Sequence, residues 1–232
     1  MPRRLALFDL DNTLLAGDSD HAWGEFLIAH KLVEEDSHRQ KNDGFYQDYL
    51  KGELDIHAYV AFTLSPIISC SSDQRTALHK EFMEHSIHPL LLGKAFDLVE
   101  EHRAADDYCL IITATNRFIT EPIAELFAVD SLLATDVEIL EDRLTGKILG
   151  TPCYQEGKIL KLRNWLERNE SGLSLKDSIF YTDSINDLPL LETVTTPIVV
   201  DPDQKLEQIS AKKGWQTLRL RGYIELARTS GK

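Results

Sequence analysis

The chain has 232 residues and a mass of 26.4 kDa, and its 43% hydrophobic and 27% charged residues are typical of a globular chain of one or two domains. Its 25 Lys and Arg residues against 38 Asp and Glu residues give a net charge of −13, so the averaged field repels nucleic acid and anionic membranes. We expect neither as a partner, and an anionic small substrate then needs a local metal ion or lysine to hold it.

Short apolar runs between turn signals predict strands that are buried on both faces of a sheet. They lie at Leu5–Phe8, Tyr108–Thr113, Ser178–Tyr181, Pro197–Val200 and Trp215–Arg219. Between them, helical patterns cover Leu91–Arg103, Pro122–Phe127 and Lys158–Arg168, with Thr120 as N-cap of the second helix and Pro122 near its first position. This alternation predicts an α/β fold with a doubly wound, Rossmann-like parallel sheet.

Two segments depart from the alternation. Val137–Glu141 and Leu144–Leu149 flank Asp142-Arg143 and predict a small β-hairpin. Residues 19–89 carry only helical periodicity and predict an inserted helical cap domain, so that residues 1–18 and 90–232 form the core domain. Because the insertion follows the first strand directly, its helices should stand over the carboxyl ends of the strands, where open α/β folds bind ligands. We expect the last residues, Ala227–Lys232, to be frayed.

The cysteine pattern and the start of the chain bear on the compartment. Cys70, Cys109 and Cys153 are odd in number and match no zinc spacing, so we expect no disulfide framework. Asp9 and Asp11 interrupt the first apolar stretch before it reaches the length of a signal sequence, and no apolar run approaches the ~20 residues of a membrane helix. We therefore expect a cytoplasmic protein that does not cross a membrane.

Two carboxylates follow the first predicted strand, in the phrase Asp9-Leu-Asp-Asn-Thr13. One Asp at a strand end is explained by an Asx-turn, but this explanation does not account for both acids together with Thr13. A second acidic set, Asp183-Ser-Ile-Asn-Asp187, follows the strand at Ser178–Tyr181. Carboxylates gathered at one sheet edge repel one another unless a cation neutralises them, and an all-oxygen set with few protein ligands suits Mg²⁺. Asp187 could also serve as the N-cap of the next helix.

Two further segments could contact phosphate. Hydroxyls and backbone amides of Thr113, Ala114 and Thr115 lie at the end of another strand and are suitable donors to phosphate oxygens. Lys158 follows Gly157 where a helix begins, and it could supply a positive charge to both the phosphoryl group and a nucleophile. An isolated lysine at that place is more often a solvated helix residue.

Taken together, the Asp9–Thr13 phrase, the strand-end Thr113, the Gly157-Lys158 pair and the Asp183–Asp187 phrase resemble the haloacid dehalogenase superfamily of aspartate-nucleophile phosphatases. The resemblance spans nearly the whole chain. The helical insertion is similar to the cap of the phosphoserine-phosphatase-like branch. The dehalogenases of this superfamily attack carbon and do not need the second aspartate, so the presence of Asp11 favours phosphoryl transfer.

The resemblance implies a role for each motif residue. Asp9 would attack phosphorus to give an aspartyl-phosphate, and Asp11 would protonate the leaving alcohol and then activate water. Thr113 and Lys158 would bind phosphoryl oxygens. Mg²⁺ would be held by a set that consists of Asp9, the main-chain carbonyl of Asp11, and Asp183, with Asp187 and Asn186 orienting its surroundings and Asn186 also facing the substrate.

The resemblance implies that the substrate is a small phosphorylated metabolite, and it narrows the class of that metabolite. Asp18 lies where the phosphoserine phosphatases of this branch carry a glutamate that meets the substrate amine. No cap arginine corresponds to the one that holds the substrate carboxylate, since Arg39 and Arg75 lie in ordinary polar surroundings, and Ala114-Thr115 replaces the usual Gly-Gly. An amine-binding acid without a carboxylate-binding arginine favours a phosphorylated amino alcohol, with L-histidinol phosphate as leading candidate and a place in amino-acid biosynthesis.

Several cap residues have two interpretations. Trp23 and His21, next to Asp20, could stack on an imidazole, although Trp23 on an apolar helix face is more often a core residue. Asp18 and Asp20 could instead cap the first cap helix, and Arg117 could reach substrate or face water.

Three alternative functions stay open at this point. One is a phosphoserine phosphatase, a second is phosphoryl transfer to an acceptor alcohol, and a third is a catalytically idle phosphometabolite-binding protein.

Overall fold

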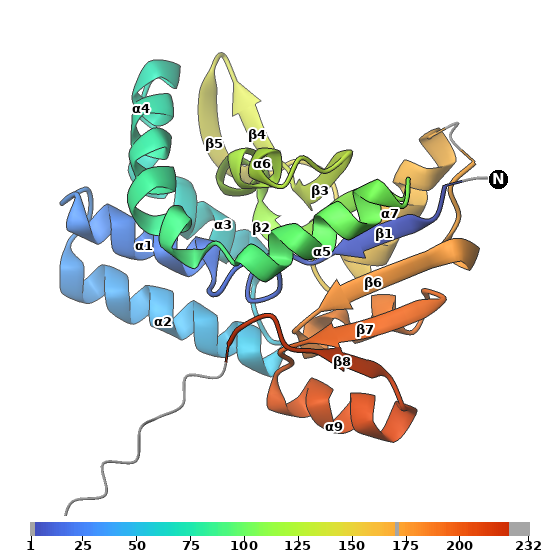
Figure 1. The fold of residues 1–232 in the computed structure, drawn as a ribbon. Helices are drawn as coiled ribbons and strands as arrows, with labels where there is room; N and C mark the ends of the chain where they lie inside the picture. Colours follow the sequence, from blue (N-terminus) through green and yellow to red (C-terminus); the bar gives the residue numbers. More distant parts are fainter. Residues whose placement is uncertain (1–2, 170–171, 223–232) are drawn as a thin grey trace, which may run out of the picture.

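The computed structural model describes residues 3–169 and 172–222, and the expected frayed end at Ala227–Lys232 lies outside them. Within these residues, six parallel strands form one sheet in the order β3-β2-β1-β6-β7-β8. The strands are β1 (Leu5–Phe8), β2 (Tyr108–Asn116), β3 (Ser131–Thr135), β6 (Ser178–Thr182), β7 (Thr196–Val200) and β8 (Gln216–Leu218). The predicted α/β fold with a doubly wound parallel sheet is therefore confirmed (Figure 1).

Nine α-helices lie within the described ranges of the chain. They are α1 (Ser19–Ala29), α2 (Glu35–Lys51), α3 (Ile56–Leu64), α4 (Ser72–Phe82), α5 (Gly93–Ala104), α6 (Arg117–Leu126), α7 (Glu156–Arg168), α8 (Leu188–Leu191) and α9 (Gln204–Lys213). Short 3-10 helices cover Ser65–Ile67, His88–Leu90, Leu175–Asp177 and Ile185–Asp187, and a π-helical turn covers Met83–Ile87. No helix in the described part of the chain has the length and apolar content to cross a membrane.

Each face of the sheet has its own hydrophobic core, because successive side chains of a strand point to opposite faces. Ala6 and Phe8 of β1 pack in one core with residues of α5 and α6, whereas Leu5 and Leu7 pack in the other with residues of α7, α8 and α9. Strands covered on both sides read as continuous apolar runs, which is why they could be found from the sequence.

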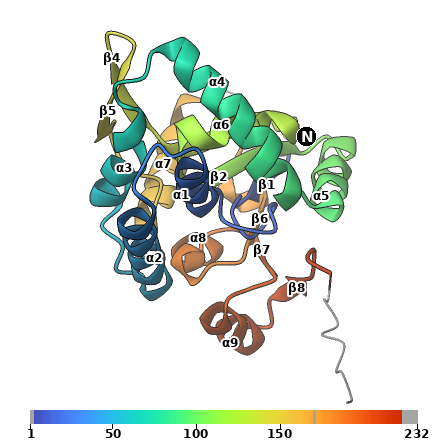
Figure 2. The same ribbon diagram turned by 90° about the vertical axis from the view of Figure 1, so that its left-hand side faces the viewer.

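Helices α1 to α4 lie together beside the sheet, as both ribbon views show (Figures 1 and 2). Their apolar residues, including Trp23, Leu27 and Phe82, belong to the same cluster as the α5 and α6 face of the sheet. This arrangement supports the division into a cap at residues 19–89 and a core at 1–18 and 90–232, which stays a prediction.

The predicted hairpin is present as β4 (Val137–Leu140) and β5 (Arg143–Ile148), paired antiparallel. Its turn is one residue earlier than expected, because Glu141 and Asp142 carry the positive φ values of 47° and 62° that a two-residue hairpin turn requires. The hairpin packs against α3, and the approach is close at Gly146, where a Cβ atom would lie 3.2 Å from Ile68 Cδ1.

The structure corrects the prediction for α6. The helix begins at Arg117, with Asn116 as N-cap, since β2 runs on to Asn116 and the Asn116 side chain accepts the Ile119 N–H. Thr120 is inside the helix, where its hydroxyl donates to the Asn116 carbonyl, and Pro122 lies in the helix interior rather than at its start. Strand β3 was not predicted, because its apolar run of Leu132 to Ala134 is too short to stand out from a turn.

Candidate active site

The order of the strands places the first acidic motif at the middle of the sheet. Strand β1 lies between β2 and β6, and Phe8 pairs in register with Ile111 on one side and Tyr181 on the other. The Asp9 N–H then donates to the Tyr181 carbonyl at 2.9 Å, so Asp9 begins a turn at the carboxyl edge of the sheet. The residue is 5% exposed. The motifs after β1, β2 and β6 therefore meet because these strands are neighbours.

Lys158 connects the two acidic motifs. Its Nζ lies 2.8 Å from Asp9 Oδ1 and 2.7 Å from Asp187 Oδ2, and the residue is 2% exposed. Burial acts to lower the pKa of Lys158, but the charges of Asp187 and Asp9 outweigh it, so the pKa is raised and the ammonium stays charged. Gly157 allows the tight start of α7, since a Cβ atom there would lie 2.1 Å from the Pro152 carbonyl oxygen.

The Asp187 side chain contacts Lys158 and does not make a cap hydrogen bond to the next helix. Its Oδ2 accepts both the Lys158 ammonium and the Thr182 hydroxyl, the latter at 2.7 Å, and its side chain makes no cap hydrogen bond to α8. Asp187 does occupy the N-cap position of α8, as the alternative interpretation had it, but its side chain makes its hydrogen bonds with Lys158 and Thr182 instead.

Thr13 links Asp9 to Asp183. Its hydroxyl donates to Asp183 Oδ1 at 3.0 Å and lies 3.5 Å from Asp9 Oδ2, while the Asp183 N–H donates back to the Thr13 oxygen. Burial raises the pKa of Asp183 well above its usual value, and the charge of Asp9 raises it further. Burial also raises the pKa of Asp9 to about 7, with Lys158 opposing and Asp187 adding to the shift.

These carboxylates fit a magnesium ion by their chemistry. Asp9 and Asp183 are mutually repelling acids, and a divalent cation between them would restore their ionised form. In residues 3–169 and 172–222, no group of three or more His, Cys, Asp or Glu side chains forms a metal cage. Mg²⁺ does not need one, because it is usually bound by one or two carboxylates and keeps several waters.

Asp11 lies across the site from this pair. Its Oδ1 accepts the Ser19 N–H and its Oδ2 accepts the Thr115 hydroxyl, both at 2.7 Å. Burial raises the pKa of Asp11 to about 6, and the charge of Asp18 contributes in the same direction, against the hydrogen bonds from Ser19 and Thr115. A carboxyl group with a pKa in this range can both give and take a proton near neutral pH.

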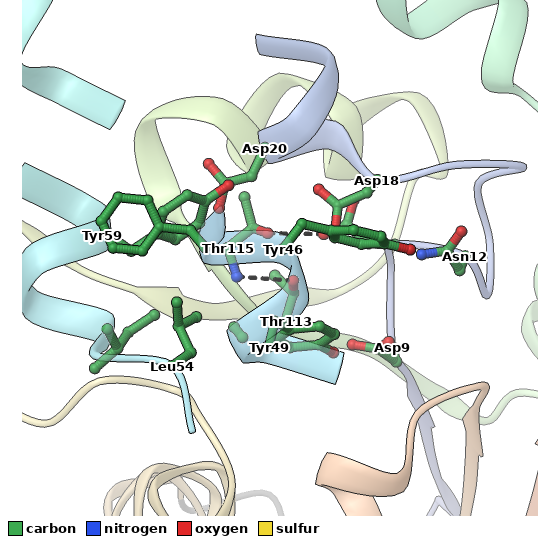
Figure 3. Close-up of a pocket in the computed structure, with 14 residues that line it drawn as sticks. Asp9, Asn12, Asp18, Asp20, Tyr46, Tyr49, Leu54, Tyr59, Thr113 and Thr115 are labelled. Atoms are coloured by element: carbon green, nitrogen blue, oxygen red, sulfur yellow. Dashed lines mark hydrogen bonds between the residues drawn. The ribbon is translucent and has the colours of Figure 1, made fainter. Parts of the chain in front are cut away.

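Asp9 and Asp11 line a pocket that is bounded by the end of β2 and by residues of α1, α2 and α3. Figure 3 shows this pocket. The pocket encloses a cavity volume of about 40 Å³, which is room for a few water molecules. Thr113, Ala114 and Thr115 line it, and the Thr115 N–H donates to the Thr113 hydroxyl oxygen. The lining residues are Asp9, Asp11, Asn12, Asp18, Asp20, Phe45, Tyr46, Tyr49, Leu54, Ile56, Tyr59, Thr113, Ala114 and Thr115.

The charge of the pocket lining has one sign. Four carboxylates line it, and among the described residues no Lys, Arg or His side chain does. Arg39 instead pairs with Glu25 and Glu35, and Arg75 donates to the Cys70 and Asp142 carbonyls. The sequence-based view that the cap offers no arginine to a substrate carboxylate is in keeping with this arrangement.

Of the cap residues considered for substrate contact, some line the pocket and others do not. Asp18 caps α1 by accepting the His21 N–H, as one interpretation had it, and it also lines the pocket, while its contact with the substrate amine stays a prediction. Trp23 does not line the pocket, because it is fully buried and packs against Phe26 and Phe82. The His21 ring faces Asp43 on the cap surface.

Two other predicted substrate residues lie outside the pocket lining. Arg117 pairs with Asp136 at 2.6 Å and donates to the Leu132 carbonyl. The Asn186 side chain donates to the Tyr49 carbonyl at 2.9 Å, and its Oδ1 accepts Gln155 Nε2 at 3.3 Å.

Gln155 Nε2 also donates to the Gly52 carbonyl at 3.1 Å, and the Tyr49 hydroxyl donates to Ser184 Oγ at 3.1 Å. These contacts tie the end of α2 to Gln155, which directly precedes α7 and Lys158, and to the segment after β6 that leads to Asp187. The sequence did not predict that Tyr46 and Tyr49 line the pocket or that Tyr49 and Gln155 make these contacts. Isolated polar or aromatic residues on a helix or in a loop carry no local signal of a long-range contact.

The comparison with protein families agrees with the motifs. A model of the haloacid dehalogenase-like hydrolase family matches residues 6–192. The chain belongs to this family, and the predicted membership is confirmed.

Relatives with names or solved structures span nearly the whole chain. A histidinol-phosphatase of Neisseria meningitidis serogroup C is 42% identical over 221 residues, covering 94% of this chain and 100% of that protein. A phosphoserine phosphatase of Mycobacterium tuberculosis is 29% identical, covering 91% of this chain and 69% of that protein.

A Bordetella pertussis Tohama I protein of unknown function has a crystal structure with TM-score 0.87 and 44% identity, covering 95% of this chain and all of that chain. A substrate-bound phosphoserine phosphatase structure has TM-score 0.66 and 15% identity, covering 94% of this chain and 93% of that chain, and supports the fold alone.

Proposed function

We propose that the protein is a Mg²⁺-dependent phosphomonoester hydrolase that forms an aspartyl-phosphate on Asp9. The observation that carries the proposal is the position of Lys158, whose buried ammonium contacts Asp9 and Asp187 at the sheet edge. A carboxylate attacks an anionic ester only where positive charge and donors offset the repulsion, and Lys158 supplies part of that charge at the nucleophile itself.

The chain's own residues provide the two half-reactions. Asp9 attacks phosphorus, and Asp11, whose pKa is raised to about 6, gives its proton to the leaving alcohol oxygen. Asp11 then takes a proton from the water that hydrolyses the aspartyl-phosphate. Thr113 and Lys158 hold phosphoryl oxygens, with the Thr115 amide nearby. Asp9, Asp183 and the Asp11 carbonyl would hold Mg²⁺, which supplies charge neutralisation and alignment of the phosphoryl group.

We further propose a phosphorylated amino alcohol as substrate, with L-histidinol phosphate as the leading candidate. Carboxylates without a cationic side chain line the pocket beyond the nucleophile, which favours a positively charged alcohol over one that carries a carboxylate. The similarity to a histidinol-phosphatase supports the same choice. The small cavity in this arrangement means that the cap helices open to admit such a molecule.

The test is a phosphometabolite panel that includes L-histidinol phosphate, L-phosphoserine and 4-nitrophenyl phosphate, assayed with Mg²⁺ and with EDTA. We expect turnover that EDTA abolishes and Mg²⁺ restores, and a preference for L-histidinol phosphate. Asp9→Asn should abolish hydrolysis. Near wild-type activity in this variant, once deamidation is excluded, would overturn the nucleophile assignment, and chelator-insensitive hydrolysis would overturn the metal assignment.

The same panel separates the alternatives. A clear preference for L-phosphoserine would mean that the argument from the missing arginine is wrong. Transfer to an added alcohol in place of water would make the protein a phosphotransferase. Mg²⁺ binding without hydrolysis of any ester would indicate an idle phosphometabolite-binding protein.

A further inference from the structure

The pocket has an end that lies away from Asp9. After burial, the charges that raise the pKa of Tyr49 most are those of Asp9, Asp187 and Asp183, whereas those acting on Tyr59 are led by Asp20. Tyr49 therefore marks the phosphate end and Tyr59 the far end. Figure 3 shows the same order, with Asp18 between Asp9 and Asp20.

We propose that Asp20 is the specificity residue for a second basic group of the substrate, a flat nitrogen-containing ring. The inference rests on the proposed hydrolysis of a phosphorylated amino alcohol. In this arrangement the phosphate lies at Asp9, the ammonium at Asp18, and the ring at Asp20 beside the aromatic side chains of Phe45 and Tyr59.

The first argument is that the Asp20 carboxylate is buried without a countercharge. Asp20 is 6% exposed and lines the pocket, and its hydrogen-bond partners among the described residues are neutral groups, the Asn116 amide at 3.3 Å and the Thr115 side chain. Burial raises the pKa of Asp20 well above its usual value, and the charges of Asp18 and Asp11 add to the shift. A cationic ligand group is the natural partner for such a carboxylate.

The place of Asp20 in the fold does not explain the burial. Asp20 lies in the first turn of α1, where the helix dipole favours an acid by about 0.3–1 kcal/mol. Burying a carboxylate costs several kcal/mol, so the dipole is too weak to account for it. Asp18 already serves as the N-cap of the same helix.

The second argument is the aromatic lining at the Asp20 end of the pocket. Tyr59 of α3 lies at this end, and Phe45 of α2 also lines the pocket and packs against Tyr59 with ring centroids 5.1 Å apart. Aromatic rings offer cation–π contacts to any cationic group, and a flat, positively charged ring can stack on them in addition. An acid and aromatic rings at one end of a pocket therefore favour an imidazole-like group.

The experiment compares Asp20→Asn with Asp18→Asn and with Asp43→Asn, an exposed acid of α2 outside the pocket lining. Asn keeps the acceptor for the Asn116 amide at position 20 and keeps the N-cap at position 18, so each variant removes charge and little else. Each is assayed on L-histidinol phosphate, which carries both basic groups, on 2-aminoethyl phosphate, which carries the ammonium, and on 4-nitrophenyl phosphate, which carries neither.

We expect Asp20→Asn to lower kcat/KM for L-histidinol phosphate by about 10- to 100-fold, chiefly through KM, and to leave the other two substrates within about threefold. Asp18→Asn should weaken both amine substrates, and Asp43→Asn neither. The melting temperature of Asp20→Asn should be unchanged or raised. An equal loss on all three substrates would assign Asp20 a structural role, and no loss on any would remove it from recognition.

Calorimetric binding of L-histidinol and of 2-aminoethanol separates this inference from the proposed function, because it needs no turnover. We expect Asp20→Asn to weaken L-histidinol binding at least tenfold and 2-aminoethanol binding little. If the wild-type protein fails to hydrolyse L-histidinol phosphate, the substrate proposal is wrong, and the binding ratio still decides the role of Asp20. Equal affinities of wild type and Asp20→Asn for L-histidinol would refute the inference.

Discussion

Replacement of Lys158 by Met removes the positive charge that two buried carboxylates share. The Lys158 ammonium lies 2.8 Å from Asp9 and 2.7 Å from Asp187, and all three side chains are at most 7% exposed. Removing one partner of a buried ion pair costs about 3–5 kcal/mol, because the remaining charge is left uncompensated. For a chain of this size the loss corresponds to a fall of about 6–20 °C in melting temperature.

The measurement is thermal and urea unfolding in EDTA, so that metal binding adds nothing to stability. Lys213→Met is the matched control, since Lys213 pairs with Glu192 at a similar distance of 2.7 Å but with 41% and 49% exposure. An exposed ion pair contributes about 0–1 kcal/mol to the free energy of unfolding, and we expect Lys213→Met to lose no more than that.

A double variant shows whether the loss comes from the uncompensated acids. Asp187→Asn neutralises one of them, so Lys158→Met with Asp187→Asn should be more stable than the sum of the two single changes predicts, by 1 kcal/mol or more. The kcat of Lys158→Met should fall by roughly 10²–10³. If Lys158→Met is as stable as Lys213→Met, the reasoning about the buried pair is refuted.

Three further predictions concern the acids and the cap contact. In metal-free protein, Asp9 has a pKa of about 7 in the native state, whereas the unfolded chain releases this proton near pH 4. The free energy of unfolding of the wild type should therefore fall by on the order of 4 kcal/mol relative to that of Asp9→Asn as the pH rises from about 4 to 7. The difference between the two proteins is the quantity to measure, since the lowered pKa of His79 acts in the opposite direction; a pH-independent difference would contradict the raised pKa. Asp11→Asn should lower kcat by about 10²–10⁴ on an alkyl phosphate and less on 4-nitrophenyl phosphate, whose leaving group needs little protonation, and equal losses on both would argue against general acid catalysis. Gln155→Gly should raise KM severalfold by removing the contacts to Gly52 and Asn186, while stability is kept or improved because Gln155 has a φ of 49°; an unchanged KM would show that this contact does not hold the cap closed.

The sequence by itself determined which acidic residues lie at the edge of the sheet. Buried strands read as apolar runs, and an acid placed directly after such a run is costly without a partner, so Asp9, Asp11, Asp183 and Asp187 could be identified before any coordinates. The order of the motifs indicated the family, and the helical periodicity of the insertion predicted a cap. Each of these features is encoded by residues that are close together in the chain, which is why a single sequence is enough to predict it.

Only the tertiary structure decided which side chains meet across elements. In the structure, Lys158 lies between Asp9 and Asp187, and Arg117 pairs with Asp136. Trp23 is a buried core residue, and tyrosines of α2 and α3 line the pocket. The start of α6 and the presence of β3 were also settled there. These outcomes depend on how helices pack against the sheet, a long-range property that residue type and spacing do not specify.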